Sequence, residues 1–120
     1  MRILLSVLLS LLFLGPAQCG EADVLKVTVK QASPGEYNFS VTIVHEDAGW
    51  DHYADKWDIL DLDGNILGTR ILHHPHDDEQ PFTRSLSSVD VPHRITSVIV
   101  RAHDSVHGYG GTEMKVTLPK

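Results

Sequence analysis

The stretch YNFSVTI, residues 37–43, decides the fold class of this 120-residue chain. Apolar side chains occupy its odd positions and polar side chains its even positions. Successive side chains of a β-strand point to opposite faces, so this alternation predicts a strand with one buried face. The turn sequence Ser33-Pro34-Gly35 precedes it, and residues 25–30 alternate in the same way before that turn. These two stretches predict the first two strands.

Five further stretches continue the pattern toward the C-terminus, with turn residues between them at intervals of roughly ten, as is typical of β-sandwiches. No stretch has the 3.6-residue period of a long amphipathic helix. Seven short strands predict an all-β, immunoglobulin-like or fibronectin-like antiparallel sandwich with Trp57 in its core. The five stretches are the one around Trp57 and Ile59, then residues 65–72, 82–88, 97–103 and 114–118.

The first 19 residues are expected to form a secretory signal peptide, which leaves residues 20–120 as a single domain. Arg2 precedes an apolar run over residues 3–14, and small residues follow that run. The run is shorter than the roughly 20 apolar residues that span a bilayer. We therefore expect a protein secreted into a periplasm, with no membrane contact after cleavage.

The chain has one cysteine, Cys19, at the expected cleavage region. Cleavage after Ala17 or after Cys19 fits the small-residue rule. A lipid anchor on Cys19 is the alternative, but Gln18 is not the small residue that such sites prefer. The body of the domain therefore has no disulfide and no thiolate for metal binding.

Acidic side chains outnumber basic ones by 16 to 10, and the formal net charge is −6. Nucleic acids and anionic membranes require a basic surface, so this balance argues against both as partners. It favours a cation as the ligand.

Seven of the eight histidines lie in three short segments. Consecutive antiparallel strands send their connections to alternate ends, so the segments 45–55, 73–81 and 103–111 should share one end of the sandwich. His93 should lie at the other end. The seven are His45, His52, His73, His74, His76, His103 and His107.

Imidazoles from three separate loops, together with the acidic residues of the same loops, predict a site for a divalent transition metal such as Fe, Cu or Zn. Carboxylates can ligate the ion or orient a ligating imidazole. Adjacent strand positions face opposite ways, so at most one of His73 and His74 should take part, and His103 has an outward orientation as its alternative. The candidate ligands are His45, His52, His76, His107, His74, Asp104 and His103.

Two motifs resemble the iron-binding domain of desulfoferrodoxin and the superoxide reductases. One runs from His45 through Asp51-His52-Tyr53 to Trp57, and the other is the stretch 104–109. The resemblance implies an immunoglobulin-like sandwich with a mononuclear ferrous centre of four histidines and one cysteine. It implies that His45, His52 and His107 are ligands, that Asp104 replaces the cysteine, and that His76 or His74 substitutes for the remaining histidine.

Three functions stay open at this point. The first is a secreted metal-binding domain, and the second is a superoxide-reductase-like oxidoreductase. The third is a metal-free module that binds a protein or glycan through Trp50, Tyr53, Tyr109 and the acidic rim.

Overall fold

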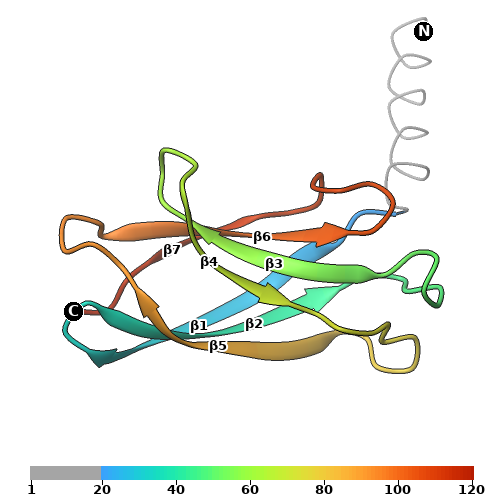
Figure 1. The fold of residues 1–120 in the computed structure, drawn as a ribbon, viewed down its shortest axis with the longest axis horizontal. Helices are drawn as coiled ribbons and strands as arrows, with labels where there is room; N and C mark the ends of the chain where they lie inside the picture. The colour runs from blue at the N-terminus through green and yellow to red at the C-terminus, as the bar shows by residue number, and fades with distance from the viewer. Residues whose placement is uncertain (1–19) are drawn as a thin grey trace, which may run out of the picture.

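The structure is a computed structural model that describes residues 20–120, so the expected signal peptide lies outside the described part. The described chain forms seven β-strands in two sheets (Figure 1). The strands are β1 (Asp23–Ser33), β2 (Glu36–Val44), β3 (Ala54–Leu60), β4 (Ile66–Ile71), β5 (Phe82–Asp90), β6 (Ser97–Asp104) and β7 (Met114–Thr117).

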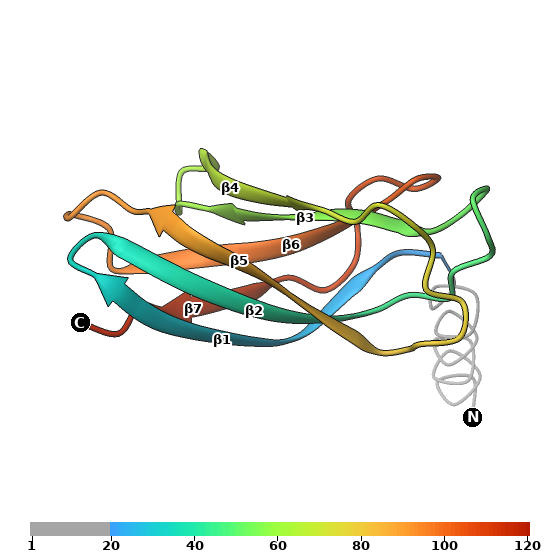
Figure 2. The same ribbon diagram turned by 60° about the horizontal axis from the view of Figure 1, so that its bottom comes forward.

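One sheet has the strand order β1-β2-β5 and the other β4-β3-β6-β7, and all pairs are antiparallel. Figure 2 shows the two sheets lying against each other as the layers of a sandwich. The predicted fold class is therefore confirmed. Within residues 20–120, the structure contains no helix of the length and apolar character needed to cross a lipid bilayer.

Several strands extend beyond the expected stretches, and two of the extensions lie near the histidines. β1 begins at Asp23 and β3 begins at Ala54, where Ala54 pairs with Asp104 of β6. Backbone pairing continues into these residues because each N–H and C=O in this region needs a partner. The extension of β3 brings the loop that carries His52 directly against the end of β6.

The core lies between the two sheets and follows the period of two. On β2 the inward side chains are Tyr37, Phe39, Val41 and Ile43, each at most 2% exposed. On β6 the inward side chains are Val98, Val100 and Ala102. Trp57 is fully buried in the same core, as predicted. Burying one such side chain stabilises the fold by about 1.5–3 kcal/mol.

The connections after β2, β4 and β6 lie at the same end of the sandwich, on the right of Figure 1. These connections carry six of the eight histidines, and His103 lies just before the third connection, on β6. The packed strands thus hold three polar loops over one end of the hydrophobic core.

Candidate metal centre

The period of two continues beyond the hydrophobic core at this end. His45 follows Ile43 by two residues, and Asp104 follows Ala102 by two. Both side chains consequently point inward between the sheets, where His45 is 3% exposed and Asp104 is 0% exposed. The same alternation that builds the core therefore places an imidazole and a carboxylate on top of it.

His45, His52 and Asp104 each offer a ligand atom, and these atoms all lie within 4.8 Å of one another. The two Nε2 atoms of His45 and His52 are 3.1 Å apart. His52 Nε2 lies 3.2 Å from Asp104 Oδ1, and His45 Nε2 lies 4.0 Å from Asp104 Oδ2. This buried triad can hold a metal ion.

The backbone of Gly20 completes the cluster. Its carbonyl oxygen lies 2.8 Å from His45 Nε2 and 3.1 Å from His52 Nε2. Gly20 has φ +109°, and a Cβ atom there would collide with the imidazole of His107. Only glycine fits this close approach without strain. The sequence argument missed Gly20, although it precedes the buried residues Ala22 and Val24 by the same two-residue step.

Asp47 orients the imidazole of His45. Its fully buried carboxylate accepts a hydrogen bond at Oδ1 from His45 Nδ1 at 2.6 Å and another from the backbone N–H of Ala54 at 3.0 Å. With Nδ1–H donated to Asp47, the other ring nitrogen, Nε2, faces the Gly20 carbonyl oxygen in the cluster. There Nε2 either donates a second proton to that oxygen or offers its lone pair to a metal ion.

One carboxylate oxygen of Asp104 is well satisfied and the other is not. Oδ1 accepts the backbone N–H groups of Val106 at 2.9 Å and His107 at 2.6 Å. Oδ2 is buried without a hydrogen-bond partner among residues 20–120. Burial raises the pKa of Asp104, but those two N–H donors and the nearby imidazoles outweigh it, so the pKa falls below its ordinary value and the group is ionised.

His107 stands at the open edge of the cluster. Its side chain is 38% exposed, and its Nδ1 lies 3.3 Å from Asp104 Oδ1. The ring centroids of His107 and His52 are 4.8 Å apart. An opening of about 320 Å³, lined by these two histidines with Gly20 and Glu46, connects the cluster to solvent.

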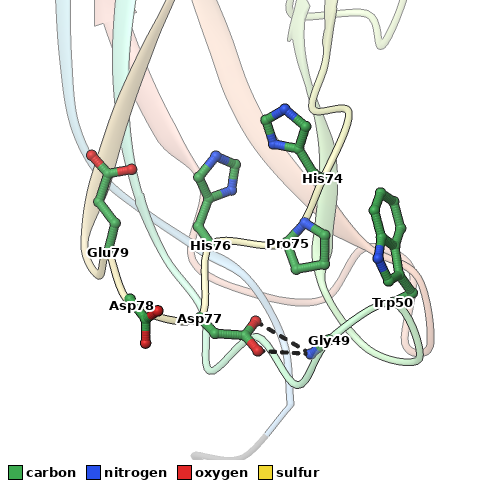
Figure 3. A pocket seen from close by; sticks show the side chains of 8 residues that line it. All are labelled: Gly49, Trp50, His74, Pro75, His76, Asp77, Asp78 and Glu79. Atoms are coloured by element: carbon green, nitrogen blue, oxygen red, sulfur yellow. Dashed lines mark hydrogen bonds between the residues drawn. The ribbon is translucent and has the colours of Figure 1, made fainter.

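The other three candidate ligands lie elsewhere. His103 faces outward from β6, where its Nδ1 lies 2.6 Å from Asp55 Oδ1. His74 and His76 line a neighbouring pocket with Trp50 (Figure 3). Burial, followed by the charge of Arg84, lowers the pKa of His76, so its ring is neutral at pH 7.

Another buried aspartate, Asp58, holds the loop that carries His107. Asp58, on the outer face of β3, accepts hydrogen bonds from Thr69 and Tyr109, each at 2.6 Å. The guanidinium of Arg101 donates to it at 3.3 Å and lies 3.7 Å from the centroid of the Tyr109 ring. These contacts pin Tyr109 to the sheet, and with it the segment that follows Asp104.

The comparisons with known proteins find one relative and no family. The chain is 48% identical over 96 residues to a protein of Halomicrobium mukohataei described as "Putative lipoprotein". The match covers 80% of this chain and 47% of that protein, so the chain spans about half the length of its relative. No family model matches the chain, and no solved structure matches it. The resemblance to desulfoferrodoxin therefore stands only on the two-sheet β fold and the histidine–aspartate cluster.

Proposed function

We propose that this domain binds one divalent transition metal ion outside the cytoplasm, through His45 Nε2, His52 Nε2 and Asp104, with the Gly20 carbonyl as a further donor. Two imidazoles and a carboxylate leave coordination positions free for water or a substrate. The solvent opening beside His107 is the side from which such a molecule would enter. His107 itself is placed to bind the ion after a small rotation of its exposed side chain.

The observation that carries this proposal is the chemistry of the four convergent groups. His45 donates its Nδ1 proton to Asp47, and its Nε2 lies 2.8 Å from a carbonyl oxygen and 4.0 Å from a carboxylate oxygen. Nε2 therefore requires either a proton or a metal ion between it and these oxygens, and neutral imidazole is the form that binds a metal. The buried Asp104 oxygen without a donor supports the same proposal, because leaving such a group unpaired costs about 1–3 kcal/mol and a bound cation would pair it.

The ligand types select the class of metal. Imidazole with carboxylate suits Fe(II), Zn(II) and Cu(II), and affinity by itself favours Cu(II). The protein supplies a partly buried pocket, an imidazole oriented by Asp47 and an anionic ligand. When bound there, the ion would supply Lewis acidity or, for iron and copper, a change of oxidation state.

Metal titration tests the proposal directly. Protein expressed from the full sequence should bind Zn²⁺ or Cu²⁺, and an ion at 100 times its Kd should stabilise the fold by about 2.7 kcal/mol. His52→Ala should abolish most of this shift in melting temperature, whereas His93→Ala, at the opposite end, should preserve it. A protein whose melting temperature does not respond to any divalent ion would instead favour the interaction module around Trp50.

Acidity provides a second test. Imidazoles bind metals only when neutral, and their ordinary pKa is about 6.5. Bound metal should therefore be released as the pH falls from 7.5 to 5, which dialysis with elemental analysis can follow. Retention of the ion at pH 5 would contradict ligation by His45 and His52.

The opening beside the centre also favours a redox function as a second candidate. A superoxide-reductase-like reaction needs an iron with a free position that superoxide can reach. Mixing the Fe²⁺-loaded protein with superoxide in a stopped-flow instrument should then accelerate superoxide decay relative to the metal-free protein. Equal rates of superoxide decay with the loaded and the metal-free protein would exclude superoxide reduction and leave metal binding as the proposed function.

The relative's description supports an extracytoplasmic location. In this chain Cys19 directly precedes Gly20, and Gly20 touches the metal centre. We infer that the mature domain is exported and that Cys19 is its lipid anchor, which would place the centre next to the membrane. Expression in a lipoprotein-processing host should give a detergent-phase protein that Cys19→Ser makes water-soluble. A wild-type chain that stays in the aqueous phase would support cleavage without lipidation.

A further inference from the structure

A second pocket lies beside the metal centre and shares no ligand atom with it. It has a volume of about 550 Å³ and is formed by the segment 74–79 together with Gly49 and Trp50 (Figure 3). Both carboxylate oxygens of Asp77 accept the backbone N–H of Gly49, each at 3.2 Å, and this contact ties the two loops together.

His76 is the unusual residue of this pocket. It is 8% exposed, and both of its ring nitrogens are buried without a hydrogen-bond partner among the described residues. Its ring stacks on Phe82 with centroids 4.1 Å apart and planes 12° apart. Its backbone N–H donates to Asp47 Oδ2 at 2.7 Å. The imidazole is therefore rigidly held. Its Nδ1 lies 4.0 Å from Asp47 Oδ2, too far for a hydrogen bond, so both ring nitrogens lack the hydrogen-bond partners that buried nitrogens normally have.

Two further possible metal ligands, His74 and Glu79, lie on the same side of the loop as His76. The ring of His74 lies 5.7 Å from that of His76, centroid to centroid, and Pro75 between them restricts the backbone. Figure 3 shows both imidazoles and the Glu79 carboxylate projecting to one side, while Asp77 and Asp78 project to the other. Glu79 is 57% exposed and pairs with Arg84 at 3.1 Å, a surface contact worth about 0–1 kcal/mol. A metal ion can displace so weak a partner.

We propose that His74 and His76 form a second metal site, with Glu79 as its exchangeable third ligand. Among residues 20–120 only the ligand atoms of His45, His52 and Asp104 already lie within 4.8 Å of one another, so His74 and Glu79 must turn toward His76 to close this second site. The site takes a divalent ion of the Cu²⁺, Ni²⁺ or Zn²⁺ type, for which two imidazoles and a carboxylate are suitable donors. Its affinity is lower than that of the first centre, because His74 is exposed and Glu79 must leave Arg84. The histidine-rich end of the sandwich thus holds two ions rather than one.

Trp50 provides a local reporter. It is 67% exposed at the edge of this pocket, whereas Trp57 is fully buried in the core. Cu²⁺ quenches nearby indole fluorescence, so titration with Cu²⁺ should reduce the emission of Trp50. The His52→Ala/Asp104→Asn double variant removes the first centre, and quenching that remains in it belongs to the second site.

The test combines stoichiometry with fluorescence. Wild-type protein dialysed against Cu²⁺ should hold two ions per chain, and the His52→Ala/Asp104→Asn variant should hold one. In that variant background, His74→Ala and His76→Phe should each weaken the remaining quenching at least tenfold in Cu²⁺ concentration. His76→Phe preserves the stacking on Phe82 while it removes both nitrogens, and His73→Ala is the matched control, with no effect on the quenching.

Two results would overturn the second site. One is a wild-type stoichiometry of a single Cu²⁺ that the His52→Ala/Asp104→Asn variant abolishes. The other is residual quenching that neither His74→Ala nor His76→Phe changes. A stoichiometry of one that survives in the His52→Ala/Asp104→Asn variant but disappears in His74→Ala would instead contradict the first centre and support the second.

Discussion

The two ends of the sandwich both bury an aspartate, and they use it differently. Asp61, in the connection between β3 and β4, is 6% exposed, and both of its oxygens are satisfied. Oδ1 accepts the backbone N–H groups of Asp63 and Asn65, and Oδ2 accepts the side-chain amide of Asn65. Asp104, at the histidine-rich end, is fully buried and leaves Oδ2 without a donor.

Asp61 therefore stabilises a turn, whereas Asp104 is suited to binding a ligand. The hydrogen bonds that Asp61 accepts, led by the side chain of Asn65, lower its pKa, so it is ionised with every partner supplied by its own turn. Asp104 instead leaves Oδ2, which lies 4.0 Å from His45 Nε2, without a hydrogen-bond donor among residues 20–120. Buried polar groups are usually paired, so the unpaired oxygen supports the proposal that a cation binds at this end of the molecule.

The largest effect on metal affinity is expected from a change to Asp104, the acid at the histidine-rich end. Asp104→Asn should weaken metal binding at least about 100-fold, more than changes to residues around a ligand usually do. The metal-free variant should keep most of its stability, because the amide oxygen can still accept the N–H groups of Val106 and His107. Isothermal titration with Zn²⁺ and urea unfolding give the two values.

The matched variant at the other end is Asp61→Asn. It should leave metal affinity unchanged and lower the urea midpoint, because its turn loses an acceptor. Equal metal affinities in Asp61→Asn and Asp104→Asn would show that the two acids do not differ in the proposed way.

Removal of the orienting carboxylate should have the next largest effect. In Asp47→Asn the new amide nitrogen must face either His45 Nδ1 or the backbone N–H of His76. The first arrangement moves the proton of His45 to Nε2, and the second opposes two donors. We expect metal affinity to fall about 10–100-fold. Asp55→Asn, which alters the acid that pairs with His103, is the control and should bind metal normally.

The variant Asp58→Asn tests how strongly Asp58 holds the loop that carries His107. Burial raises the pKa of Asp58, but the hydrogen bonds from Thr69 and Tyr109 and the charge of Arg101 outweigh it, so the folded pKa lies below the ordinary value of 3.8. The ionised group therefore stabilises the fold above that pH, and its contribution disappears as the pH falls through the folded pKa. Asp58→Asn should lower the free energy of unfolding at pH 7 by about 1–3 kcal/mol.

The pH dependence of the stability of Asp58→Asn provides a control for this prediction. The stability difference between wild type and Asp58→Asn should shrink below about pH 4, where the carboxyl group protonates in the unfolded chain. Urea unfolding between pH 7 and pH 3 measures it. A difference that stays constant over this range would assign the loss to packing rather than to the carboxylate charge.

The smallest effect is expected at a histidine that lies near the centre in sequence but not in space. His103 adjoins Asp104 yet faces outward toward Asp55 and Tyr109. His103→Gln should change Zn²⁺ affinity by less than about twofold, as is usual for surface substitutions away from a site. A loss comparable to that of His52→Ala would place His103 in the ligand set.

The sequence by itself determined the seven strands, the buried Trp57 and the shared end of the three histidine-bearing loops. These features depend on the alternation of side chains along a strand and on the reversal of direction at each turn, and both are properties of the local chain. The same alternation, extended by one step from Ile43 and from Ala102, places His45 and Asp104 over the core.

Only the tertiary structure decided which groups meet at that end. It brought the Gly20 carbonyl to His45, gave Asp47 the role of orienting that ring, and put His74 and His76 in a pocket of their own. The Gly20 contact joins residues far apart in sequence, and the other two arrangements depend on the packing of loops whose backbones have no repeating pattern. Side-chain period can predict the face on which a histidine lies, but the distance between two loops depends on everything that packs beneath them.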